Sequence, residues 1–177
     1  EELTGPEYAS RFIGRMKSLP IDFLPRTTVM DFDDGMERKT VYAFSRHDGV
    51  TAVSTHAIVL AMGCQERNRG GIGIPGTRPS GVFTAGLAQR LVNVEGYIPG
   101  ERVVIVGSGD IGLIMARRMT WVGSTVLGVV EIQPYPSGLT RNIVQCLNDF
   151  SIPLHLSHVI SRIHGKDRIE GVTVSPL

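Results

Sequence analysis

Val103-Val104-Ile105-Val106-Gly107-Ser108-Gly109-Asp110-Ile111-Gly112 is the stretch that decides how this chain folds. Four apolar residues lead directly into a G-x-G-x-x-G pattern, which is typical of a phosphate-binding turn between a strand and a helix. Gly107 permits the sharp turn, Gly109 lets a pyrophosphate approach the backbone, and Gly112 lets the helix pack on the strand. The free N–H groups and positive dipole end of that helix favour an anion, so residues 107–112 are predicted to bind a dinucleotide.

The sequence around the loop fits a β-α-β unit. Pro99-Gly100 precedes the strand, Leu113 to Val122 is predicted as the helix, and Gly123 is placed to end it. A second strand, Thr125 to Val130, ends at the acidic residue Glu131. Glu131 lies about 20 residues beyond the loop, where a Rossmann unit places the carboxylate that binds the adenosine ribose. The alternative is an ordinary β-α-β unit with a glycine turn and a solvated glutamate.

Glu131 also bears on the choice of cofactor. An acid at this position favours the free 2′-hydroxyl of NAD, whereas NADP needs a nearby arginine. Arg141 could reach a 2′-phosphate, but a solvated helix arginine is the simpler interpretation, so NAD is favoured over NADP. Asp110 would repel a pyrophosphate, and its side chain is expected to point away and help cap the helix. A different adenine ligand, such as S-adenosylmethionine, remains an alternative on the same fold.

Composition places the chain among soluble globular proteins. Its 177 residues are 42% hydrophobic and 20% charged, with a net charge of +1. This balance offers no attraction to nucleic acid, and no apolar run approaches the ~18 residues of a membrane span. The first residues do not resemble a signal peptide, and Cys64 and Cys146 form no C-x-x-C pair, so a reducing cytoplasm and no metal site are expected.

Hydrophobic periodicity predicts the remaining elements. Ala57 to Met62 is a continuous apolar run that is expected to form a buried strand ending at Gly63. Residues 64–81 are rich in Gly, Arg and Pro and are predicted to form a loop, in which Arg67 and Arg69 are mobile charges. Further helices are expected at 7–19, 85–94 and 140–150, and further strands at 27–32, 39–46, 51–54, 154–163 and 169–174.

At this point the chain resembles the pyridine-nucleotide oxidoreductases, flavoproteins that bind both FAD and NAD(P). The stretch Ala57 to Gly63 is similar to the family's A-T-G motif near FAD, with Met62 in place of the usual Thr. The run Arg78 to Asn93, followed by the glycine loop, resembles a narrower branch. That branch contains the flavin subunits of hydrogen cyanide synthase, opine oxidase and the multi-subunit proline and sarcosine dehydrogenases.

The resemblance implies an α/β, Rossmann-like fold in which a parallel sheet with one dinucleotide-binding unit is joined by an antiparallel hairpin or meander. Residues 1–100 are expected to be a partial flavin domain and linker, and residues 101–177 a truncated NAD(P)-binding domain. Gly63 would lie beside the flavin. A first glycine loop for FAD is missing, and Leu87 stands where the late flavin motif has Asp, so residues 81–86 are interpreted as linker and helix start.

The function expected from these features is an FAD-dependent, NAD(P)-linked oxidoreductase, of which this chain holds the nicotinamide site and does not retain FAD. Cofactors would supply the chemistry, because neither a Ser-His-Asp set nor a paired-carboxylate motif is present. Cys64 is expected to be a buried, inert thiol, and the histidines near 155–164 isolated strand residues. The alternative is a non-catalytic NAD-binding or assembly module, in a homodimer or a complex of different subunits.

Overall fold

The computed structural model describes residues 3–177, and the chain divides into two compact units, residues 1–63 and 64–177. The division lies before the boundary that the sequence placed at residue 100, because the intervening segment packs on the second unit. Gly76 and Ser80 form β-bridges with Ile163 and Arg168, and Val92 belongs to that unit's core. Which cofactor each unit serves stays a prediction.

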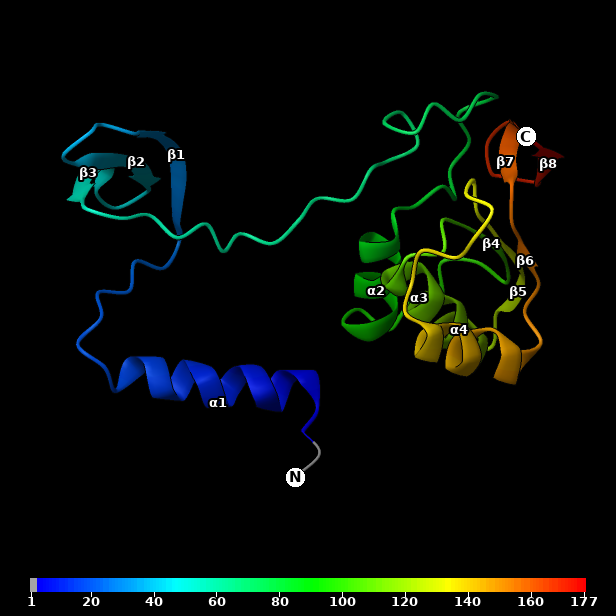
Figure 1. Ribbon diagram of the computed structural model, residues 1–177, viewed down its shortest axis with the longest axis horizontal. Coiled ribbons are helices and arrows are strands. Elements are labelled where there is room, and N and C mark those ends of the chain that lie inside the picture. Colours follow the sequence, from blue (N-terminus) through cyan, green and yellow to red (C-terminus); the bar gives the residue numbers. More distant parts are fainter. Residues whose placement is uncertain (1–2) are drawn as a thin grey trace. The chain divides into compact units, whose positions relative to one another are not determined.

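The first unit consists of one helix and a three-stranded antiparallel meander (Figure 1). Helix α1 (Gly5–Lys17) begins with Pro6 in its first turn and a capping box in which Thr4 and Glu7 bind each other. Strands β1 (Thr27–Asp33), β2 (Lys39–Ser45) and β3 (Gly49–Thr55) pair in sequence order. Ala43 and Ser45 are the buried residues among those described in this unit, so it has almost no core.

The predicted buried strand at Ala57 to Met62 is wrong. These residues have no regular secondary structure, and Val59 is 87% exposed. A buried strand needs neighbours on both edges, and the meander β1–β3 does not pair with this segment. Cys64, which follows it, is exposed, so the expectation of a buried thiol there is also wrong.

The second unit is built on a parallel sheet of order β4-β5-β6. Its elements are α2 (Ala85–Asn93), β4 (Arg102–Val106), α3 (Asp110–Trp121), β5 (Thr125–Val130), α4 (Thr140–Cys146), the 3₁₀ turn η1 (Asn148–Phe150) and β6 (Leu154–His155). The antiparallel hairpin β7 (His158–His164) and β8 (Gly171–Pro176) completes the unit. This arrangement confirms the predicted Rossmann-like α/β fold.

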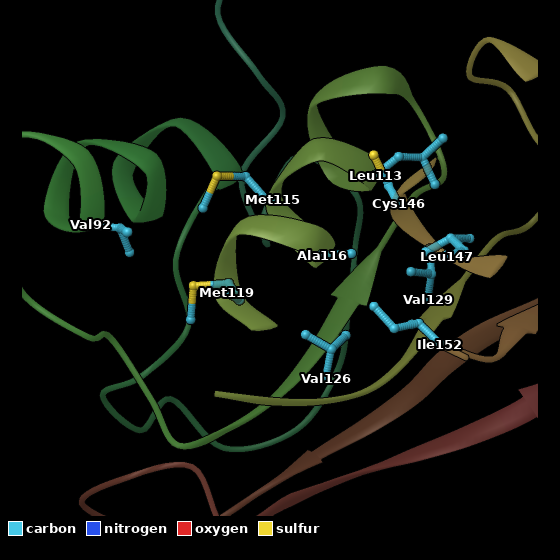
Figure 2. Close-up of a cluster of buried hydrophobic side chains, with 10 residues drawn as sticks. All are labelled: Val92, Leu113, Met115, Ala116, Met119, Val126, Val129, Cys146, Leu147 and Ile152. Carbon is cyan, nitrogen blue, oxygen red and sulfur yellow. The ribbon is translucent and has the colours of Figure 1, made fainter. Parts of the chain in front are cut away.

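Both faces of the parallel sheet are covered, as alternation along its strands requires. Side chains of Val103, Ile105 and Val129 face the helices, where a cluster of ten buried residues forms the main core (Figure 2). Val104 and Val130 point to the opposite face and pack against β7 and β8. The sheet therefore holds β4, and the loop that follows it, in a fixed place.

Two predicted elements are shorter than expected. The helix predicted at 140–150 ends at Cys146 and continues as η1, after which Ser151 has a φ of 54°. The strand predicted at 154–163 is divided into β6 and β7 because Ser157, with a φ of 54°, turns the chain out of the parallel sheet. The Ser157 N–H donates to the carbonyl oxygen of Gln133 at 3.0 Å.

The loop before α2 is more ordered than the sequence indicated. The Arg69 guanidinium donates to the carbonyl oxygens of Ile74, Gly76 and Thr77. The Glu66 carboxylate accepts from the Gly86 N–H at the start of α2, at 2.6 Å. Arg69 therefore holds residues 69–77 in place. The prediction that it is a mobile charge is wrong.

Candidate functional site

The glycine loop connects β4 to α3 with the geometry that the sequence predicts. Gly107 has a φ of 95°, and its N–H donates to the Val130 carbonyl of β5 at 2.8 Å. A Cβ on Gly112 would lie 2.6 Å from the Gly107 carbonyl oxygen. Positive φ at the first glycine and close packing at the third explain why both positions need glycine.

The start of α3 is open toward solvent. Gly109 is the N-cap residue, and no described side chain caps the first turn. A Cβ added to Gly109 would meet no atom within 4 Å, although the residue has an ordinary φ of −63°. The fold itself therefore does not require glycine at position 109, whereas a ligand that touched this backbone would. The unpaired N–H groups and the dipole of a twelve-residue helix suit an anionic group here.

Glu131, at the end of β5, is tied to the loop. Its Oε2 accepts from the Ser108 N–H at 2.9 Å and from the Ser108 hydroxyl at 2.5 Å. The Ser137 hydroxyl donates to the same oxygen at 3.3 Å, and the Gln133 N–H donates to Oε1 at 2.9 Å. Glu131 is only 4% exposed, and Ser108 is fully buried. The carboxylate thus fixes the second residue of the loop against β5.

Hydrogen bonds keep this buried carboxylate ionised. Burial alone would raise the pKa of Glu131, but donors from Gln133, Ser108 and Ser137 together lower the pKa below its ordinary value. A charge that is buried and paired in this way stabilises the fold only above the pH at which it protonates. The site therefore has a permanent negative charge at neutral pH.

Asp110 points away from the loop, as expected, but it does not cap its own helix. Its Oδ1 accepts from the Leu139 N–H at 2.8 Å and from the Asn142 amide at 2.7 Å, so it binds the start of α4. The Leu139 N–H and the Asn142 amide lower the pKa of Asp110. The expected cap of α3 is thus wrong, because the carboxylate instead accepts from donors at the start of α4.

The structure brings most of the predicted site residues together. One broad open depression is lined by Gly107, by Gly109 to Gly112 and by Glu131, together with His155 and His158. Ser108, the remaining residue of the loop, is buried beneath it. Gly63, the remaining predicted site residue, belongs to the first unit. Among the described residues no group of histidine, cysteine or acidic side chains could hold a metal ion.

Sequence reasoning missed Ser137 and Asn142. Ser137 lies in the connection between β5 and α4, and Asn142 lies in the first turn of α4. The connection packs on the glycine loop, since a Cβ on Gly138 would be 2.8 Å from the Ser108 carbonyl oxygen. The signal was present in Pro134, Pro136 and Gly138, which indicate a shaped connection rather than a free loop.

Curated proteins and solved structures resemble this chain. Over 135 residues it is 30% identical to an opine oxidase subunit of Agrobacterium tumefaciens, covering 72% of this chain and 26% of that protein. Over 165 residues it is 30% identical to the CoA-dependent NAD(P)H sulfur oxidoreductase of Pyrococcus abyssi, covering 89% of this chain and 35% of that protein. The chain therefore spans between a quarter and about a third of the length of these relatives.

Solved structures agree on the fold. Thioredoxin reductase of Lactococcus lactis matches with a TM-score of 0.66 at 15% identity, covering 97% of this chain and 53% of that one. An NAD-dependent persulfide reductase from A. fulgidus matches with a TM-score of 0.61 at 21% identity, covering 89% and 29%. The family model described as pyridine nucleotide-disulphide oxidoreductase matches residues 5–175. With nearly its whole length matched, the chain belongs to the pyridine nucleotide-disulphide oxidoreductase family.

Proposed function

We propose that the second unit binds NADH through its diphosphate at the start of α3 and, in the whole protein, presents the nicotinamide for hydride exchange with a flavin. The observation that carries the proposal is the open space over Gly109. A diphosphate fits there because the helix start is uncapped and the backbone is accessible. The nicotinamide supplies the hydride chemistry, while the chain binds and orients the dinucleotide.

Glu131 supports NAD over NADP in this proposal. Its Oε1 accepts one described hydrogen bond, from the Gln133 N–H, and a carboxylate oxygen has room for a second donor such as a ribose hydroxyl. A 2′-phosphate beside this ionised group would be repelled. No described side chain forms an ion pair with Glu131 that would offset the repulsion.

The flavin in this proposal is inferred from the family to which the chain belongs, and not from the residues described here. The first unit contains α1, the meander and the segment 57–63, and none of these forms a strand, glycine turn and helix. These described residues therefore do not fit the diphosphate of a flavin nucleotide, although related full-length enzymes use one.

Binding of NADH by the Gly109→Val variant tests the proposal. A valine at this position should leave the fold intact, because it meets open space, and should abolish NADH binding measured by calorimetry. Gly14→Val, in helix α1 of the first unit, is the matched control, because its Cβ also meets open space and its backbone φ is not positive. Equal affinity of wild type and Gly109→Val for NADH would show that the assigned site is wrong.

Nucleotide preference is tested with Glu131→Gln rather than with an arginine. Glu131 is buried and holds Ser108, so a guanidinium there would disrupt the loop before it could bind a phosphate. The glutamine removes the charge and keeps the size, and the variant should discriminate less between NADH and NADPH than wild type. S-adenosylmethionine, titrated in parallel, should not bind; tight binding of this ligand would favour the other class of adenine ligand.

A second candidate function is supported by the relatives that are subunits. Two of the matched proteins are opine oxidase subunits, from Agrobacterium tumefaciens and Rhizobium meliloti. In this alternative the nucleotide site is a binding or assembly element of a multi-subunit flavoprotein that oxidises an amine or amino acid. Failure of NADH to reduce the flavin of the whole protein, with NADH binding intact, would favour the alternative.

A further inference from the structure

Residues 132–139, which we call the strap, connect β5 to α4 and lie against the glycine loop. Two backbone N–H groups join the strap to loop side chains: Ser137 donates to the Ser108 hydroxyl at 2.9 Å, and Leu139 donates to Asp110 at 2.8 Å. The Gln133 N–H binds Glu131 at the other end. The strap is thus attached at its start and near its end.

Asp110 makes the attachment nearest to α4. A single oxygen, Oδ1, accepts both the Leu139 N–H and the Asn142 amide, so one side chain joins the first turn of α3 to the start of α4. The contact between strap and loop is tight at this point. A Cβ on Gly138 would lie 2.6 Å from Leu113 Cδ1 and 3.0 Å from Asp110 Oδ1.

A carboxylate at this position has a cost for the proposed ligand. Asp110 is the first residue of α3, next to the open backbone of Gly109, and its negative charge opposes a diphosphate bound there. A neutral residue would avoid the repulsion. The two hydrogen bonds to α4 give a reason for an acceptor at this position, but they require only an oxygen and not a charge.

We propose that Asp110 is a positioning residue that holds the strap closed on the glycine loop and thereby sets the affinity for the adenosine diphosphate half of the dinucleotide. The strap follows directly after Glu131, and its first residue, Ile132, lines the same depression as the loop, beside the proposed ribose site. When the end of the strap at Leu139 is released from Asp110, the strap is closed in a smaller fraction of molecules. The apparent affinity for the dinucleotide falls in proportion to that fraction. This inference rests on the proposed function of the loop.

Three variants separate the role of the hydrogen bonds from that of the charge. Asp110→Ala removes both bonds and the charge, Asp110→Asn keeps an accepting Oδ1 and removes the charge, and Asn142→Ala removes one of the bonds. Asp149→Ala, at an exposed acid of η1, is the control for the change in net charge. Circular dichroism confirms that each variant is folded.

Calorimetry with two probes, NADH and ADP-ribose, gives the result. Asp110→Ala should lose about tenfold or more in affinity for both probes. Both probes contain the adenosine diphosphate half, and fewer molecules of this variant have the strap closed to bind it. Asn142→Ala should lose less, Asp110→Asn should bind at least as tightly as wild type, and Asp149→Ala should not differ from wild type. Hydrogen exchange of the Leu139 amide, without ligand, should accelerate in Asp110→Ala and not in Asp110→Asn.

Other results overturn the inference. Unchanged affinity in Asp110→Ala would show that the strap does not control binding, and so would a loss for NADH without a loss for ADP-ribose. An Asp110→Asn variant as weak as Asp110→Ala would assign the effect to the charge. A wild-type chain that binds neither probe would contradict the proposed function itself, a result distinct from unequal behaviour of the variants.

Discussion

The two units differ in how much of their apolar surface they bury. In the second unit, three helices and the β7–β8 hairpin cover a parallel sheet, and Leu113, Ala116 and Val129 are fully buried. In the first unit, β1 to β3 form a regular meander, yet Val29 and Met30 are more than half exposed. Regular hydrogen bonding alone therefore does not make a stable unit, because burial of apolar surface supplies most of the stabilisation.

The largest expected difference is in local stability. Backbone amides of β5 and α3 should exchange with deuterium only through global unfolding, whereas amides of β1 to β3 should exchange orders of magnitude faster, since few apolar contacts protect them. Hydrogen exchange with mass spectrometry on the whole chain measures both. Equal protection in the two units would show that the meander has a stabilising partner, such as a second copy of the chain.

Flavin retention sharpens the same comparison. The purified chain is expected to carry no FAD, because the described part of the first unit has no phosphate-binding turn and each missing charge-assisted hydrogen bond costs about 1.5–3 kcal/mol. The absorbance of the purified chain in the visible flavin bands is the measurement. A yellow protein with stoichiometric FAD would contradict this expectation outright.

Core truncation gives a smaller effect that is confined to one unit. Leu113→Ala should lower the free energy of unfolding of the second unit by about 3 kcal/mol, through lost burial and a residual cavity. Val29→Ala is the corresponding truncation in the meander, at a residue that is 60% exposed. It should lower the free energy of unfolding by less than about 0.5 kcal/mol. Urea unfolding followed by the fluorescence of Trp121 measures the second unit. Similar losses in both variants would mean that the units share one core.

The sequence could predict the second unit because its signals are local. The glycine loop, the helix that follows it and Glu131 all lie within one β-α-β unit, where spacing along the chain determines spacing in the structure. The exposed run Ala57 to Met62 shows the limit of this reasoning. Its composition is that of a buried strand, but burial depends on strands that must pair with it, and composition does not specify them.

In the candidate site, too, the sequence predicts contacts between residues close in the chain but not contacts that depend on tertiary packing. The loop residues and Glu131 could be predicted from spacing, whereas the partners of Asp110 could not. Leu139 immediately precedes α4 and Asn142 lies within it, and their approach depends on how α4 packs against α3. The direction of the Asp110 side chain, away from the loop, could be predicted from repulsion alone; its destination needed the tertiary structure.

The smallest expected effect concerns the buried charge that joins β5 to the loop. Glu131→Gln should cost the second unit about 2 kcal/mol at neutral pH, because one face of the amide presents a donor where the carboxylate accepted one. The pKa of Glu131 is lower in the folded chain than its ordinary value of 4.5, so its ionisation favours folding. That contribution is complete above the ordinary value and is lost as the pH falls through the folded value.

The difference in stability between wild type and Glu131→Gln should therefore be largest near pH 7 and should shrink as the pH falls below the ordinary pKa of 4.5. Urea unfolding at several pH values measures it, and subtracting the two profiles cancels the other carboxylates, including Asp110. The first unit has no buried carboxylate among its described residues, so its exchange rates, corrected for intrinsic chemistry, should not follow this profile. A difference that stayed constant down to acid pH would mean that Glu131 holds the loop by shape alone, with no contribution from its charge.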